Sequence, residues 1–67
     1  MTLKEFFSKF DYGTVAYLMQ ADKNGRVVPL FQCTYKDAAH GRYKDCKVEK
    51  ARIVHQYPFL DIIIRVD

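Results

Sequence analysis

Hydrophobic residues at the start of the chain recur at the spacing of an α-helix. Leu3, Phe6, Phe7 and Phe10 occupy positions i, i+3, i+4 and i+7, which lie on one helical face. Thr2 and Glu5 have the spacing of a capping box, and Gly13 is a typical residue to follow a helix end. A helix of about ten residues is marginal in water alone, so its apolar face is expected to pack on the rest of the protein.

After Gly13 the pattern changes to residues typical of β-strands. We predict strands over residues 14–20, 27–35, 47–55 and 60–66. Asn24 and Gly25 predict a hairpin with a type I′ turn between the first two strands. Pro29 cannot donate a ladder hydrogen bond, so it indicates an edge strand or a bulge. In the third strand the apolar residues switch from even-numbered to odd-numbered positions near Lys50, which indicates a bulge there.

This order of elements predicts the fold class. We expect a single α+β domain over residues 1–67, in which one N-terminal amphipathic helix packs on a four-stranded, mostly antiparallel sheet. The order is helix, hairpin, connection and hairpin, and the connection over residues 36–42 has room for one helical turn. A chain this short buries only about 60% of its unfolded surface, so the phenylalanine stripe is interpreted as the lid of the core.

One short helix covers only one face of a four-stranded sheet, and here both strand faces carry apolar residues. Tyr17, Phe31 and Ile62 are apolar, and a second set of apolar residues in the same strands occupies the alternate positions, which face the other way. We therefore expect an apolar sheet face, or a free strand edge, that is covered by another protein or by a second copy of the chain. The candidate partner-binding residues are Leu18, Val28, Leu30 and Ile63.

Charge gives an alternative function. The chain has a net charge of +3, and residues 36–52 contain six basic and three acidic residues, so the whole excess lies in that segment. Cations near aromatic rings are typical of surfaces that bind single-stranded nucleic acid. The candidate residues for that function are Lys36, Arg42, Tyr43, Lys44, Lys47, Lys50 and Arg52. The interspersed acids favour a simpler interpretation, in which these residues form a solvated strand face and lysines protect a sheet edge.

The pattern of chemically reactive residues argues against an enzyme. Cys33, His40, Cys46 and His55 are separated by six, five and eight residues, whereas paired zinc ligands are usually two to four residues apart. The three glycines are isolated, so they do not form a phosphate-binding loop. We expect no catalytic, cofactor-binding or metal site.

Hydropathy and cysteine content give expectations for location. The longest apolar run, residues 59–64, is interrupted by Asp61 and is far shorter than the roughly 20 residues of a membrane span. Residues 1–20 lack the cleavage site of a signal peptide. We therefore expect no membrane partner and a cytoplasmic protein whose two cysteines, Cys33 and Cys46, are reduced.

Several segments together resemble a known kind of protein. The order "TLKEFF", "GTVAYLM", an Asn-Gly hairpin, a Tyr-Lys-Asp connection and "LDIIIRV" resembles small proteins carried by bacterial phages and mobile elements. That resemblance implies a bacterial cytoplasm and a non-enzymatic role. Small proteins of this origin include inhibitors of host defence, such as anti-CRISPR proteins, which act by occupying a surface on a nuclease. Many of those inhibitors are acidic mimics of DNA, whereas this chain is basic.

Overall fold

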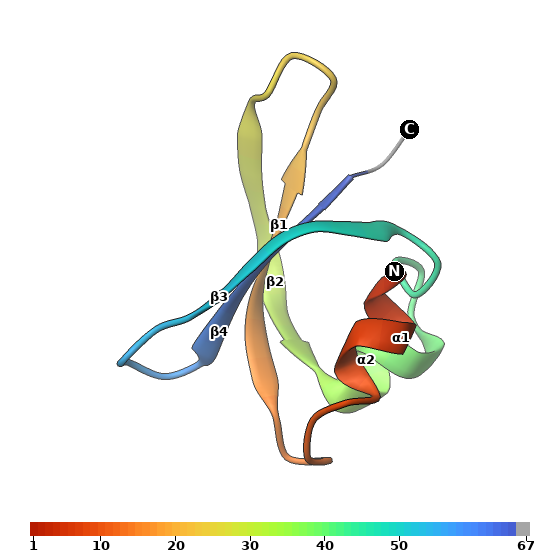
Figure 1. Ribbon diagram of the computed structural model, residues 1–67, viewed down its shortest axis with the longest axis vertical. Coiled ribbons are helices and arrows are strands. Elements are labelled where there is room, and N and C mark those ends of the chain that lie inside the picture. Colours follow the sequence, from red (N-terminus) through yellow and green to blue (C-terminus); the bar gives the residue numbers. More distant parts are fainter. Residues whose placement is uncertain (66–67) are drawn as a thin grey trace.

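The computed structural model describes residues 1–65, which form two short helices and four strands (Figure 1). Val66, the last residue of the fourth predicted strand, lies outside the described residues. The elements in chain order are α1 (Leu3–Phe7), β1 (Val15–Ala21), β2 (Val27–Thr34), α2 (Tyr35–His40), β3 (Lys47–Ile53) and β4 (Phe59–Arg65).

The strands form one mixed sheet in the order β2-β1-β4-β3. Each consecutive pair is an antiparallel hairpin, and the two hairpins meet through the parallel pairing of β1 with β4. The α+β class and the mostly antiparallel sheet are therefore confirmed. The parallel pair at the centre of the sheet was not predicted, because local sequence patterns do not indicate which strands of different hairpins become neighbours.

Both helices begin at capping boxes. The Thr2 hydroxyl accepts from the Glu5 amide at 3.2 Å, and the Glu5 carboxylate accepts from the Thr2 amide at 2.9 Å. Thr34 and Asp37 make the same reciprocal pair at the start of α2. The predicted length of the first helix was wrong, because the amides of Lys9 and Phe10 bond to carbonyls three residues back, in the tighter pattern of a turn.

The predicted irregularities of the edge strands are confirmed, and the predicted turn type is not. The β1–β2 register shifts beside Pro29 on the edge strand β2, and the β3–β4 register shifts between Val48 and Lys50. Among residues 1–65, Gly25 and Phe59 are the residues with a positive φ. Gly25, with a φ of 83°, is therefore the only one in the β1–β2 turn. A type I′ turn needs two such residues, so the loop is instead built on the Gly25 amide bonding to the Asp22 carbonyl at 3.0 Å.

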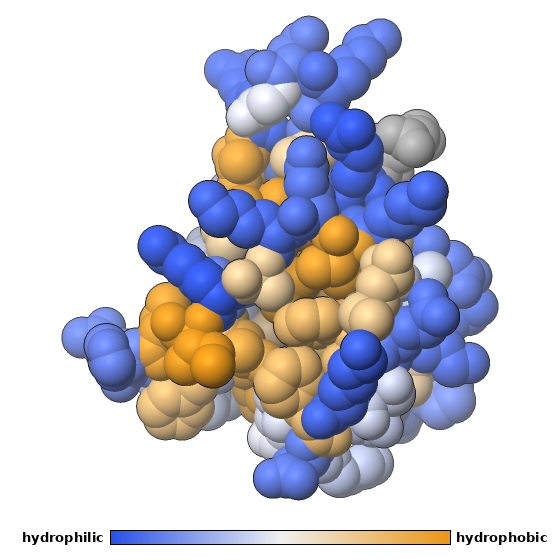
Figure 2. All heavy atoms as spheres, in the orientation of Figure 1, coloured by the Kyte–Doolittle hydropathy of each residue, from blue (hydrophilic) through white to orange (hydrophobic). Residues whose placement is uncertain are grey.

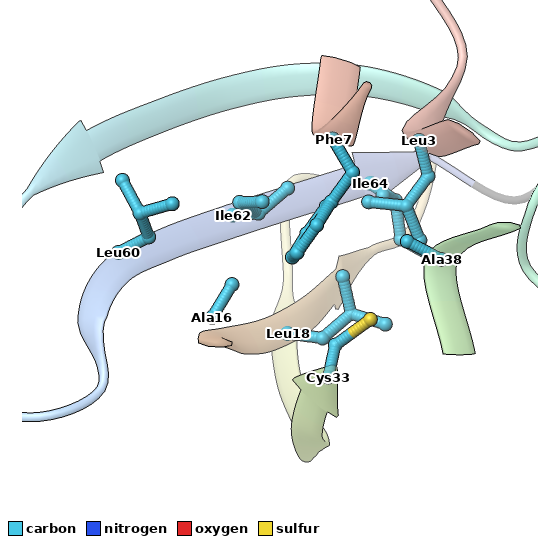
Figure 3. Packing of buried hydrophobic residues seen from close by; sticks show 9 residues of the cluster. All are labelled: Leu3, Phe7, Ala16, Leu18, Cys33, Ala38, Leu60, Ile62 and Ile64. Atoms are coloured by element: carbon cyan, nitrogen blue, oxygen red, sulfur yellow. The ribbon is translucent and has the colours of Figure 1, made fainter. Parts of the chain in front are cut away.

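The core lies between the two helices and one face of the sheet. Leu3 and Phe7 of α1 point toward Leu18 of β1 and Ile62 of β4, and Ala38 of α2 closes the same layer (Figure 3). The other buried members are Ala16, Cys33, Leu60 and Ile64. Phe6 and Phe10 pack on this cluster at its margin. The interpretation of the phenylalanine stripe as the lid of the core therefore agrees with the packing.

Both helices lie on the same side of the sheet (Figure 1). They pack against each other near one end of the strands, where the amides of Leu3 and Lys4 bond to the carbonyls of Cys46 and Lys44. The second sheet face therefore has no helix over it within residues 1–65. We call this second face the open face.

Candidate interaction surface

The open face has an apolar centre formed by neighbouring residues of β1 and β4. Leu18 and Ile62 point into the core, so the residues beside them in each strand point the opposite way. The apolar ones among these neighbours are Tyr17, Met19 and Ile63, and Asp61 is the charged one. Met19 lies directly across the parallel pairing from Ile63, and all three side chains remain accessible to solvent. The prediction of residual apolar surface on a second sheet face is confirmed in this coarse form.

Three adjoining hollows run along the open face. The central one, of about 380 Å³, has Tyr17, Met19 and Ile63 in its lining, together with Lys50 and Arg52 from β3. It shares Lys50 and Ile63 with a hollow of about 280 Å³ toward the β1–β2 turn. It shares Tyr17 with a hollow of about 430 Å³ toward the β3–β4 turn. We call the three together the open-face groove.

Ionic groups of β3 and β4 line one side of this groove. Arg52 donates from Nε to Asp61 at 3.1 Å, and Arg65 lies 3.5 Å from Glu49. Lys50 lies opposite Ile63 and makes no ion pair with any residue of the described chain. Lys50, Arg52, Glu49 and Asp61 line the hollows, whereas Lys47 and Arg65 lie on the same sheet face outside the lining. The groove therefore combines an apolar floor with a lining whose two acids are each paired with an arginine, which leaves Lys50 as the cation of the lining without an ion pair in residues 1–65.

A second apolar surface lies at the end of the β3–β4 hairpin. Figure 2 shows hydrophobic residues gathered at this end. Ile53 is 79% exposed and Phe59 is 54% exposed. The rings of Tyr57 and Phe59 are 5.8 Å apart, edge to face. These residues, with Phe10, line a hollow of about 490 Å³, and we call the four the hairpin-end patch.

Sequence reasoning missed the hairpin-end patch. Ile53 lies within the predicted third strand, and Tyr57 and Phe59 lie between the predicted third and fourth strands. Two aromatic residues on either side of Pro58 were the available signal, because large rings placed in a turn have few core neighbours.

The four predicted partner-binding residues do not share a surface. Leu18 is fully buried under the helices, so its assignment to an exposed face was wrong. Leu30 is the extra residue of the β2 bulge and packs against the core. Val28 is exposed but pairs with Gln20, which has the parity of Leu18, so it lies on the helix side. Only Ile63 lies on the open face, because strand parity separates two faces without identifying which one the helices cover.

The seven predicted nucleic-acid residues are also divided between the two sides. Lys36 is in α2, and Arg42, Tyr43 and Lys44 are in the loop between α2 and β3. The other three, Lys47, Lys50 and Arg52, belong to β3 and lie on the open face.

Several members of that set already have intramolecular partners. The ring centroids of Tyr43 and Phe31 are 6.1 Å apart. The Arg42 guanidinium carbon lies 5.3 Å from the centroid of the Tyr43 ring. Lys44 is paired with Asp45 at 2.8 Å. The structure therefore does not bring the seven residues together on one surface.

The cysteines have the properties of unreactive thiols. Burial is the main cause that raises the pKa of Cys33, to about 12, and the nearby Asp37 charge adds to it. Burial also raises the pKa of Cys46. Cysteine reacts as a thiolate, so both groups are weak nucleophiles near neutral pH. Within residues 1–65, His, Cys, Asp and Glu side chains do not gather in any group of three that could hold a metal ion.

Comparisons with other proteins add no relative. No protein-family model, curated protein or solved structure matches this chain. Neither α1 nor α2, the helices of the part of the chain described, has the length and apolar character needed to cross a membrane.

Proposed function

We propose that this protein is a non-enzymatic interaction protein that acts by binding the surface of a larger protein. Its resemblance to phage and mobile-element proteins supports a bacterial cytoplasm as its setting. In that setting the larger protein would be a host defence protein, and binding would inhibit it, as anti-CRISPR proteins do.

The observation that carries this proposal is the uncovered apolar centre of the open face. Contiguous apolar surface rimmed by polar residues is typical of sites that bind another protein. Tyr17, Met19 and Arg52, which line the open-face groove, are of residue types enriched at the centres of protein–protein interfaces. The raised pKa values of Cys33 and Cys46 further support a role without nucleophilic chemistry.

A protein partner is favoured over nucleic acid by the placement of the aromatic rings. Stacking on single-stranded bases requires accessible ring faces beside the cations. Tyr43 packs with Phe31 and Arg42, and Tyr35 packs with Phe7 and Tyr12, all on the helix side. Lys50 and Arg52 project from the other side, where Tyr17 is the one ring among the described residues that line the central hollow, so these cations lack a series of rings for successive bases.

A plaque assay tests the inhibitory function. The protein is expressed in a panel of bacterial strains, each with one active CRISPR system, and each strain is infected with a phage that this system targets. We expect recovery of plaques in at least one strain, and no change in a strain without the system. Full interference in every strain of the panel would contradict the proposed inhibition.

Two matched substitutions test the surface. Ile63→Asp introduces a charge on the open face, and Val28→Asp introduces one at an exposed apolar residue of the helix side. We expect Ile63→Asp to abolish plaque recovery and Val28→Asp to retain it, with circular dichroism confirming that both variants are folded. The reverse pattern would assign binding to the helix side.

A further inference from the structure

We infer that the open-face groove receives an acidic segment of a partner protein, one whose apolar side chains rest on Tyr17, Met19 and Ile63. This inference rests on the proposed function and adds the chemistry of the partner. It commits to a linear segment because the three hollows adjoin one another along the strand direction. Strand β4 has seven residues, and a strand of that length extends for about 20 Å.

The charge beside the groove identifies the chemistry of the segment. Lys50 lines both the central hollow and the hollow toward the β1–β2 turn, and no acid within residues 1–65 is paired with it. A segment seated on Ile63 would place its own side chains next to Lys50, which lies across the β3–β4 pairing from Ile63. Carboxylates at those positions would supply the missing counter-charge.

Arg52 offers a second site for a carboxylate. Its side chain is 71% exposed, and its hydrogen bond to Asp61 uses only Nε. The two Nη groups remain available to form a forked pair with a partner carboxylate, the geometry for which arginine is best suited. Lys50 and Arg52 are adjacent cationic positions on the same side of the groove, so two acids on one segment can contact both.

The same charges argue against a second copy of this chain as the occupant. Lys47 and Lys50 lie on this side without an acid paired to them in residues 1–65, and two such faces brought together would oppose these like charges. Like-charge juxtaposition across an interface opposes association. An acidic partner gains from the same arrangement through faster association and through correct orientation on the groove.

A peptide selection followed by NMR tests the inference. A random linear peptide library is selected on the immobilised protein, and an enriched peptide is then titrated into isotope-labelled protein. We expect enriched sequences in which Asp or Glu alternates with Leu, Phe or Trp. We also expect the largest amide shifts at Tyr17, Met19 and Ile63.

Charge variants provide the decisive comparison. Lys50→Glu should weaken binding of the peptide by roughly tenfold, the change expected when an attractive pair becomes repulsive. The matched control is Lys36→Glu, which reverses an exposed lysine of α2 on the helix side and should leave affinity within about twofold. A peptide with its acids replaced by lysine should regain affinity for Lys50→Glu.

The alternative outcomes have separate meanings. Uncharged peptides that shift the groove amides, with no effect of Lys50→Glu, would overturn the acidic partner while leaving the proposed function intact. Shifts confined to Ile53 and Phe59 would overturn the open-face groove as the binding site. Oligodeoxythymidine that shifts the groove amides with a steep salt dependence would assign the groove to nucleic acid. Failure to enrich any peptide would also overturn the inference.

Discussion

The two cysteines differ in their access to solvent although both are free thiols. Cys33 of β2 is fully buried in the core, and its Sγ lies 3.5 Å from the Thr34 carbonyl oxygen. Cys46 is half-buried at the start of β3. At mildly alkaline pH, a pKa of about 12 instead of 9.0 reduces the thiolate fraction of Cys33 by about a thousandfold.

We predict that the native protein reacts with a thiol reagent at Cys46 and not at Cys33. Ellman's reagent at mildly alkaline pH should label the Cys33→Ala variant, which retains Cys46, much faster than the Cys46→Ser variant. In guanidinium chloride both variants should react at similar rates, because unfolding removes the burial that raises the pKa. Fast labelling of Cys33 under native conditions would contradict the buried position.

At the scale of the element, the helices depend on their caps more than on their length. α1 has five residues and α2 has six, both too short to be stable as isolated helices. Each capping box satisfies amides that the first helical turn leaves without partners. At the other end of α2, a Cβ at Gly41 would collide with the Asp37 carbonyl oxygen, so glycine is required there.

We predict that Thr34→Ala lowers the free energy of unfolding by about 1 kcal/mol, because it removes the hydroxyl that accepts from the Asp37 amide at 3.2 Å. Urea denaturation measures this change. Thr34→Ser is the matched control, since it keeps the hydroxyl and should stay within a few tenths of a kcal/mol of the native protein. Equal losses for the two variants would show that the cap contributes nothing to stability.

At the scale of the whole molecule, one sheet with helices on one side gives consecutive residues opposite roles. Ile62 is fully buried against Leu18 and the helices, whereas Ile63 lies on the open face and remains partly exposed. The folding of the domain therefore depends on Ile62, and the proposed binding depends on Ile63.

We predict that Ile62→Ala costs about 2–5 kcal/mol of unfolding free energy, through lost burial and the cavity that remains. A domain of this length has a total stability of only about 3–10 kcal/mol, so this variant should be largely unfolded or close to it. Ile63→Ala should cost clearly less and remain folded. Thermal unfolding followed by circular dichroism compares the two, and equal losses would contradict the assignment of the two faces.

Local signals in the sequence predicted the elements well. The Thr2–Glu5 capping box, the strands and the bulge near Lys50 depend on residues close together in the chain, and the structure contains each of them. The extent of the first helix and the turn at Gly25 were predicted less well. Helix propensity did not anticipate that tighter hydrogen bonding would end α1 at Phe7.

The candidate site was predicted only in outline. The sequence indicated that some apolar sheet surface would remain uncovered, and Ile63 is part of it. Leu18 was assigned to that surface wrongly, because Leu18 and its neighbours Tyr17 and Met19 are all suited to burial. The sequence also did not reveal the hairpin-end patch, whose exposure depends on how far α1 reaches over the sheet.

The sequence alone determined that this chain forms a capped N-terminal helix, two hairpins and strands with apolar residues on both faces, because hydrogen bonding and side-chain alternation act over a few residues. Only the tertiary structure decided that β1 pairs with β4 and that both helices pack on the face of Leu18 and Ile62. Those choices are made by contacts between distant segments, since the burial of one face over the other depends on the combined packing of all six elements.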